Sequence, residues 1–224
     1  MGQGISEVLV FAVGVAISPV PIIAVTLMLF SRRAQVNGPV FLLGWLAALA
    51  VVSGAAYILA GQGNASTSSS TSDAVAWGKI AFGFVFLLLA ARNWRARPAP
   101  GTEPEMPKWM GGIDSLTPAK ALGLGVLLAG VNPKNLMLAL AAGAGLAQLG
   151  LTTTDAIGSL LVFVIVGSLT IAAPVGYFRL GGEHAKARLD EMKSWLAIHN
   201  DAVMAVLFLV FGVDLIAKGL PPLT

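Results

Sequence analysis

Six long apolar segments, separated by short polar loops, are the feature of this sequence that most limits its fold. Each segment is long enough to cross the roughly 30 Å hydrocarbon core of a bilayer as an α-helix. None shows the alternating pattern of a barrel strand, and a helix satisfies its own backbone hydrogen bonds in lipid. The sequence therefore predicts an all-α membrane protein with six transmembrane helices. They span residues 5–30, 40–60, 74–92, 119–149, 156–178 and 202–220.

The composition supports this class and excludes others. Of the 224 residues, 56% are apolar and only 11% are charged, whereas a soluble domain carries about 25% charged residues. The absence of cysteine excludes thiol–disulfide transfer and thiolate metal sites. No metal-ligand spacing, phosphate loop or nucleophile motif occurs, so we expect a protein that is not an enzyme and needs no metal or cofactor. The small net charge of +3 reflects loop bias and does not indicate nucleic-acid binding.

The basic residues are distributed unequally among the loops. Eleven of the fourteen Lys and Arg residues lie in or beside the first, third and fifth loops, and the second and fourth loops have none. By the positive-inside rule, the three basic loops face the cytoplasm. We therefore expect a multi-pass protein of a bacterial plasma membrane with both termini outside. Within the fifth loop, residues 183–198 predict an amphipathic helix along the inner surface, because apolar residues recur there at helical spacing.

Proline interrupts two of the segments near their middle. Residues 17–21 read Ile-Ser-Pro-Val-Pro, and residues 131–135 read Val-Asn-Pro-Lys-Asn. An offset of 114 residues places Pro19 on Pro133 and the start of the first segment on the start of the fourth. Two three-helix halves with matched breaks are typical of a 3+3 inverted repeat, in which the substrate site lies at the midplane. The predicted parts are a first half at 1–97, a cytoplasmic linker at 98–117 and a second half at 118–224.

The broken helices expose backbone groups that lipid cannot satisfy. Proline has no amide donor, so carbonyl groups near Pro19, Pro21 and Pro133 lose their helical partners. Polar side chains beside the breaks can bond these groups or a ligand. The candidate substrate-binding residues are Ser18, Asn132, Lys134 and Asn135.

Lys134 is the most informative of these residues. An ammonium near the bilayer centre is costly and indicates a functional role. Together with two helix N-termini at the breaks, it favours an anionic or zwitterionic substrate. The alternative interpretation is structural: the two breaks are paired kinks, and Lys134 caps the carbonyl groups of a broken helix.

Three further charged residues lie in the outer thirds of their segments. Glu7, Lys79 and Asp214 either pair with one another or reach the membrane interface. Reaching the interface is the simpler interpretation.

The two breaks also resemble a known family. The stretch Val-Asn-Pro-Lys-Asn-Leu at residues 131–136 is similar to the Asn-Pro-Lys signature of the LysE-type exporter superfamily. With Ser-Pro-Val-Pro at residues 18–21, it resembles the GAP/Sap branch, the glycopeptidolipid- or sulfolipid-addressing proteins. This resemblance covers the whole chain and implies an exporter of small molecules or a helper in moving cell-envelope lipids outward. Amino-acid exporters of the superfamily usually have an Asn-Pro-Gly-Pro type of sequence in the first span, so the resemblance disfavours an amino-acid substrate.

Two hypotheses of function follow. The first is a secondary exporter that works by alternating access and in which Lys134 holds an anionic headgroup or carries a coupling proton. The second is an accessory protein of a larger lipid exporter that moves nothing itself. The expected partners are membrane lipids and a small-molecule or lipid substrate, with a larger exporter or a second copy of the chain in a homodimer as candidate protein partners.

Overall fold

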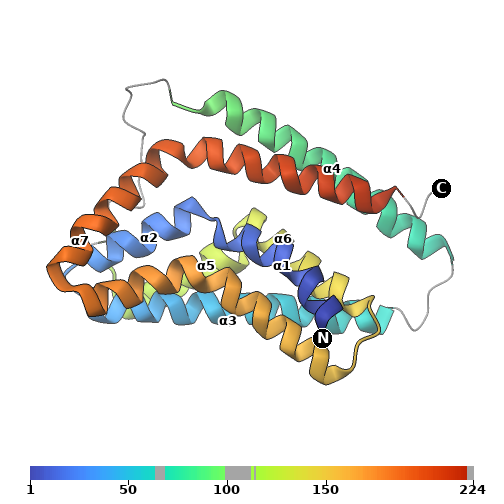
Figure 1. Ribbon diagram of the computed structural model, residues 1–224, viewed down its shortest axis with the longest axis horizontal. Helices are drawn as coiled ribbons and strands as arrows, with labels where there is room; N and C mark the ends of the chain where they lie inside the picture. The colour runs from blue at the N-terminus through green and yellow to red at the C-terminus, as the bar shows by residue number, and fades with distance from the viewer. Residues whose placement is uncertain (64–68, 99–111, 114, 221–224) are drawn as a thin grey trace. The chain divides into compact units, whose positions relative to one another are not determined.

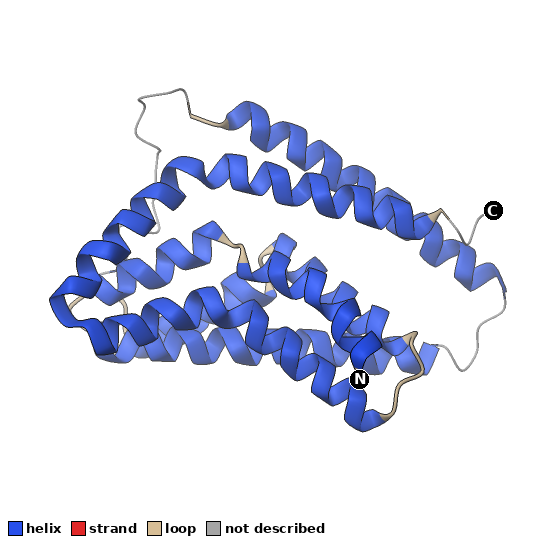
Figure 2. Ribbon diagram, viewed as in Figure 1, coloured by secondary structure: helices blue, strands red, loops and turns tan. Residues whose placement is uncertain are grey.

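The protein is helical throughout the part of the chain that the structure describes. The computed structural model describes residues 1–63, 69–98, 112–113 and 115–220. Within these ranges there is no strand, as Figure 2 shows. Most of the predicted linker at 98–117 lies outside the described residues. Seven helices follow in order (Figure 1): α1 (Gly2–Ala16), α2 (Pro19–Phe30), α3 (Ala34–Gly63), α4 (Ser69–Ala96), α5 (Pro118–Gly130), α6 (Pro133–Ala147) and α7 (Thr153–Gly219).

Two consecutive helix pairs are bent sharply at short breaks. The axes of α1 and α2 differ by 55°, and those of α5 and α6 by 63°; the first of these bends is visible in the blue part of the ribbon in Figure 1. Four unbroken stretches are long and apolar enough to cross a membrane, and each bent pair can add one more, which gives up to six candidate spans. The chain is therefore a multi-pass membrane protein. The unbroken stretches are Ala34–Gln62, Ala76–Ala96, Thr153–Gly181 and His184–Gly219.

Each second helix of a bent pair begins at a proline. Pro19 opens α2 and Pro133 opens α6. Proline is tolerated in the first turn of a helix because the N–H that it lacks would have no partner there. Ser18, just before α2, has an extended backbone (φ −125°, ψ 91°), which is the conformation that a following proline favours.

α7 is longer than the sequence predicts. The fifth and sixth predicted segments and the charged stretch between them form one continuous helix. The charged stretch has no proline and is rich in Ala, Lys, Glu and Leu, which are strong helix formers. The predicted amphipathic helix at 183–198 is thus the middle of α7, and its Ala185 and Leu189 are buried.

The chain divides into two compact units. The first combines Met1–Gln62 with Met106–Ser194, and the second combines Gly63–Glu105 with Trp195–Thr224. Each unit takes segments from both halves of the predicted repeat, and the division into repeat halves stays a prediction.

In the first unit, α1 packs on α6 and α2 contacts α5. Glycines bring α3 unusually close to α5 and α6. A Cβ atom at Gly125 of α5 would meet the carbonyl oxygen of Phe41, and one at Gly143 of α6 would meet that of Ser53. Only glycine allows two helix backbones to approach this closely, so α3 supports both arms of the second bent pair.

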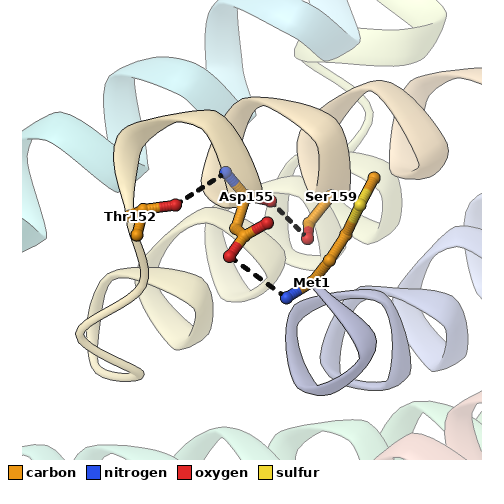
Figure 3. A network of polar contacts seen from close by, with 4 residues as sticks. All are labelled: Met1, Thr152, Asp155 and Ser159. Atoms are coloured by element: carbon orange, nitrogen blue, oxygen red, sulfur yellow. Dashed lines mark hydrogen bonds and ion pairs between the residues drawn. The ribbon is translucent and has the colours of Figure 1, made fainter.

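The start of α1 is also fixed, at the beginning of α7 (Figure 3). The amino group of Met1 forms an ion pair with Asp155 at 3.3 Å. The Asp155 N–H donates to Thr152 Oγ1 at 3.2 Å, and Ser159 Oγ donates to the Asp155 carbonyl at 2.8 Å. This network holds α1 on α7 far from its break.

The second unit is built from α4 and the last part of α7. Gly83 and Gly212 face each other, since a Cβ atom on either would meet the carbonyl oxygen of the other. Phe86 and Phe208 pack with ring centroids 5.4 Å apart. The contact of small residues and the aromatic pair together hold these two helices in register.

Candidate functional site

The candidate site lies where the break between α1 and α2 meets the start of α6. Three of the polar residues that the sequence singled out are almost completely buried there. Lys134 is 3% exposed, Ser18 2% and Asn135 0%. The first unit therefore brings together side chains that lie more than one hundred residues apart in the chain.

The ammonium group of Lys134 has an acceptor for each of its three hydrogens. Nζ donates to the carbonyl oxygen of Gly14 at 2.7 Å, to that of Ile17 at 2.8 Å and to Ser18 Oγ at 2.7 Å. All three acceptors belong to the end of α1 and the residues that follow it. None of the ion pairs among the described residues involves Lys134. Neutral oxygens alone therefore solvate this buried cation.

These contacts replace the donors that the prolines remove. In an uninterrupted helix, the N–H groups of residues 19 and 21 would bond the carbonyl oxygens of Val15 and Ile17. Pro19 and Pro21 have no N–H group. Ser18 Oγ donates to the Val15 carbonyl at 2.6 Å instead, and Lys134 Nζ donates to the Ile17 carbonyl. Two side chains thus satisfy the two carbonyl groups that have no N–H partner because of the two prolines.

The neighbouring carbonyl groups are satisfied as well. The backbone of Ile17 (φ −82°, ψ 74°) forms an inverse γ-turn, which takes the N–H of Ser18 away from Gly14 and brings it to the Ala16 carbonyl at 2.9 Å. The Gly14 carbonyl therefore accepts from Lys134. The Ala16 carbonyl accepts a second bond from Thr170 Oγ1 of α7 at 2.6 Å. An unpaired buried carbonyl costs about 1–3 kcal/mol, so this set of bonds is what allows the helix to end inside the protein.

Thr170 is a member of this bonded set that the sequence does not indicate. A threonine within an apolar span usually bonds a carbonyl of its own helix one turn earlier, as Thr26 does with Ile22 at 2.8 Å. Nothing in the sequence distinguishes Thr170 from such a residue. Its role depends on α7 passing beside the end of α1, which is a matter of tertiary packing.

Asn135 links the two breaks. Its Oδ1 accepts from Ser18 Oγ at 3.0 Å, and its Nδ2 donates to the Leu128 carbonyl of α5 at 2.9 Å. The single hydrogen of the Ser18 hydroxyl is shared between Asn135 and Val15. Asn135 therefore satisfies a carbonyl group of the second bent pair while it contacts the first.

Asn132 has a local role. Its Oδ1 accepts from the Lys134 N–H at 3.1 Å and so caps the N-terminus of α6. The residue is half-buried, whereas Pro133 beside it is exposed. Of the four predicted substrate-binding residues, Ser18, Lys134 and Asn135 form the buried cluster and Asn132 lies at its edge.

The remaining charged residues of the spans lie elsewhere. Asp214 forms an ion pair with Lys218, one turn further along α7, at 3.3 Å. Glu7 lies beside Gly145, because a Cβ atom there would meet its carboxylate. Glu7 belongs to the first unit, and Lys79 and Asp214 belong to the second. A pairing of Glu7 with either of them stays a prediction. Over the described ranges, no three His, Asp or Glu side chains gather as metal ligands would.

The chain matches a known protein family. A family model described as Sap, sulfolipid-1-addressing protein, matches residues 8–221. The match covers nearly the whole chain, both breaks and Lys134. No curated protein and no solved structure matches the chain.

Proposed function

The chain belongs to the Sap, sulfolipid-1-addressing protein, family, and from this premise we propose that it exports an anionic cell-envelope lipid across a bacterial plasma membrane. The family description and the apolar helices link the protein to lipid export. The observation that carries the mechanism is the buried ammonium of Lys134 at a broken helix. A cation in such a position can bind an anionic headgroup.

The arrangement of the helices supports an inverted repeat. The offset of 114 residues maps the end of α1, Ala16, on the end of α5, Gly130, and maps Pro19 on Pro133. In such a repeat, α1 corresponds to α5 and α2 corresponds to α6. The contact of α1 with α6 therefore predicts an equivalent contact of α5 with α2, and both contacts are present. Matched broken helices at a repeat interface favour alternating access by rocking of one half against the other.

The hydrogen bonds of Lys134 indicate how a substrate headgroup would bind. All three ammonium hydrogens are engaged, so a headgroup binds only by displacing some of their acceptors. An anionic oxygen adds the Coulomb attraction of opposite charges to the hydrogen bond, which a neutral carbonyl oxygen does not. A sulfate, phosphate or carboxylate therefore competes well with carbonyl oxygens for the ammonium. Release of Ser18 and of the α1 carbonyl groups would then free the break to move, with Asn132 and Asn135 beside the substrate.

Replacing Lys134 tests this proposal. The protein is reconstituted in liposomes with a fluorescent sulfated glycolipid, and outward movement is followed by chemical quenching of the fluorophore. We expect Lys134→Met to abolish movement while the variant still elutes as a folded protein. Lys120→Met removes an exposed lysine at the start of α5 and serves as the control with normal movement. Unchanged transport by Lys134→Met excludes the proposed role.

The accessory role is the second candidate, and one observation favours it. Because the protein itself satisfies every donor of Lys134, the cluster is complete without a ligand, as in a purely structural pair of kinks. In that case, the purified protein moves no lipid in liposomes. Lipid export from cells that carry the chain would nevertheless stop when the gene is deleted, because a larger exporter would need it.

A further inference from the structure

The end of α1 presents several neutral oxygens to one point. The carbonyl oxygens of Gly14 and Ile17 and the hydroxyl oxygen of Ser18 surround the Lys134 ammonium at 2.7–2.8 Å. We call these three oxygens the α1 cage. The Val15 and Ala16 carbonyl groups are adjacent in the chain but already accept from Ser18 and Thr170.

The position of the α1 cage favours a cation. The carbonyl end of a helix carries about half a negative elementary charge, and the α1 cage lies at that end of α1. Unwound backbone carbonyls at the C-terminal ends of half-helices are the groups that coordinate small cations in broken membrane helices. The contacts that hold Lys134 are thus those of a cation site whose present occupant is tethered to α6.

We propose that the α1 cage is a binding site for a monovalent cation, which Lys134 fills in this structure and which potassium or ammonium takes when Lys134 leaves it. The exchange in the wild-type protein rests on the proposed function, because there an anionic substrate draws Lys134 away. The existence of the site does not rest on it. The ammonium of Lys134 and a free cation then occupy the same three oxygens in turn.

The absence of a carboxylate among the three oxygens of the α1 cage favours a monovalent over a divalent cation. Divalent cations such as calcium and magnesium are held by several oxygens that usually include carboxylates. The α1 cage has only carbonyl and hydroxyl oxygens. Rings of carbonyl oxygens are the ligands that select potassium in channels. Ammonium and potassium are close in size, so oxygens spaced for the ammonium of Lys134 suit both ions.

The test empties the α1 cage by shortening residue 134. The full-length Lys134→Ala variant is purified in detergent, and its thermal unfolding is measured in chlorides of choline, sodium, potassium, ammonium and methylammonium at equal ionic strength. We expect potassium, ammonium or methylammonium to raise the midpoint of Lys134→Ala by several degrees over choline, because a ligand that binds only the native state stabilises it. The wild-type protein should show no such difference, since its own ammonium excludes the ion.

Two further variants locate the effect. Lys134→Met fills the space with an uncharged side chain of similar length, so it should not respond to cations. Adding Ser18→Ala to Lys134→Ala removes one oxygen of the α1 cage and should weaken the response. An equal response in all three backgrounds would place the ions elsewhere and overturn the proposal.

Failure of folding is also informative. A site that accepts potassium should let Lys134→Ala fold when the salt is present during purification. If Lys134→Ala is unfolded in every salt while Lys134→Met folds, the α1 cage does not take free cations. Because thermal unfolding does not depend on export, these results stand whether or not the liposome assay shows movement of lipid.

Discussion

At the scale of single residues, the cluster shows how a helix can end inside a membrane protein. The two prolines remove two donors, and one hydroxyl and one ammonium replace them. The serine is close in sequence to the carbonyl that it satisfies, whereas the lysine comes from a helix 117 residues away. The first bend is therefore maintained partly by its own residues and partly by the second bent pair.

A comparison of two buried serines tests this account. Ser18 donates to the Val15 carbonyl, which has no N–H partner because residue 19 is proline. Ser53 donates to the Leu49 carbonyl at 2.8 Å, which lies within α3 and keeps the helical N–H bond of Ser53. We expect Ser18→Ala to lower the free energy of unfolding by about 1–3 kcal/mol more than Ser53→Ala, because only the first leaves a buried carbonyl unpaired. Chemical unfolding in detergent measures the difference, and equal losses would contradict it.

The sequence indicated the members of the cluster more reliably than their contacts. Ser18, Lys134 and Asn135 stand out because polar residues beside prolines in an apolar span need a reason to be there. Which carbonyl group each one reaches depends on how α1 crosses α6, and this crossing is set by side chains along both helices. Thr170 could not be found for the same reason, because its partner lies on another helix.

At the scale of elements, the second bent pair depends on α3. α3 contacts both α5 and α6 with glycines at the contacts, so one unbroken helix supports two helices that are bent relative to one another. The helix boundaries at Ala16 and Pro19 lie where the sequence has proline. Helix was predicted at 183–198, but as a separate surface helix; its continuity with the spans on either side in α7 was not predicted, although its residues favour helix.

Two glycines of α5, two residues apart, allow the effect of helix packing on stability to be measured apart from the effect of helix propensity. A Cβ atom at Gly125 would meet the backbone of Phe41 and Trp45, whereas one at Gly123 has nothing within 4 Å. We expect Gly125→Ala to destabilise the protein by about 1–3 kcal/mol, because it pushes α3 and α5 apart. Gly123→Ala should be neutral or stabilise it by up to about 1 kcal/mol, because alanine is the better helix former. If the two variants unfold at the same temperature, the close approach of α3 is not a source of stability.

At the scale of the whole molecule, the site joins what we propose to be two halves of an inverted repeat. Lys134 and Asn135 come from the second half and bond to Gly14, Ile17 and Ser18 of the first. Rocking of the halves would therefore break these bonds or carry the α1 break along with α6. If the bonds break, the state with Lys134 in the α1 cage is one end of the proposed motion, and a bound anion or cation would define the other.

The orientation of the two halves can be tested directly because the chain has no cysteine. In an inverted repeat, the loop after α2 and the equivalent loop after α6 lie on opposite sides of the membrane. The charge distribution predicts that Arg33, after α2, lies inside and that Thr154, at the start of α7, lies outside; both residues are exposed. In intact cells, a membrane-impermeant maleimide should label Thr154→Cys but reach Arg33→Cys only after the membrane is opened. Gln62→Cys, at the end of α3, should behave like Thr154→Cys. Labelling of Arg33→Cys and Thr154→Cys from the same side would exclude the inverted repeat and, with it, the alternating-access mechanism.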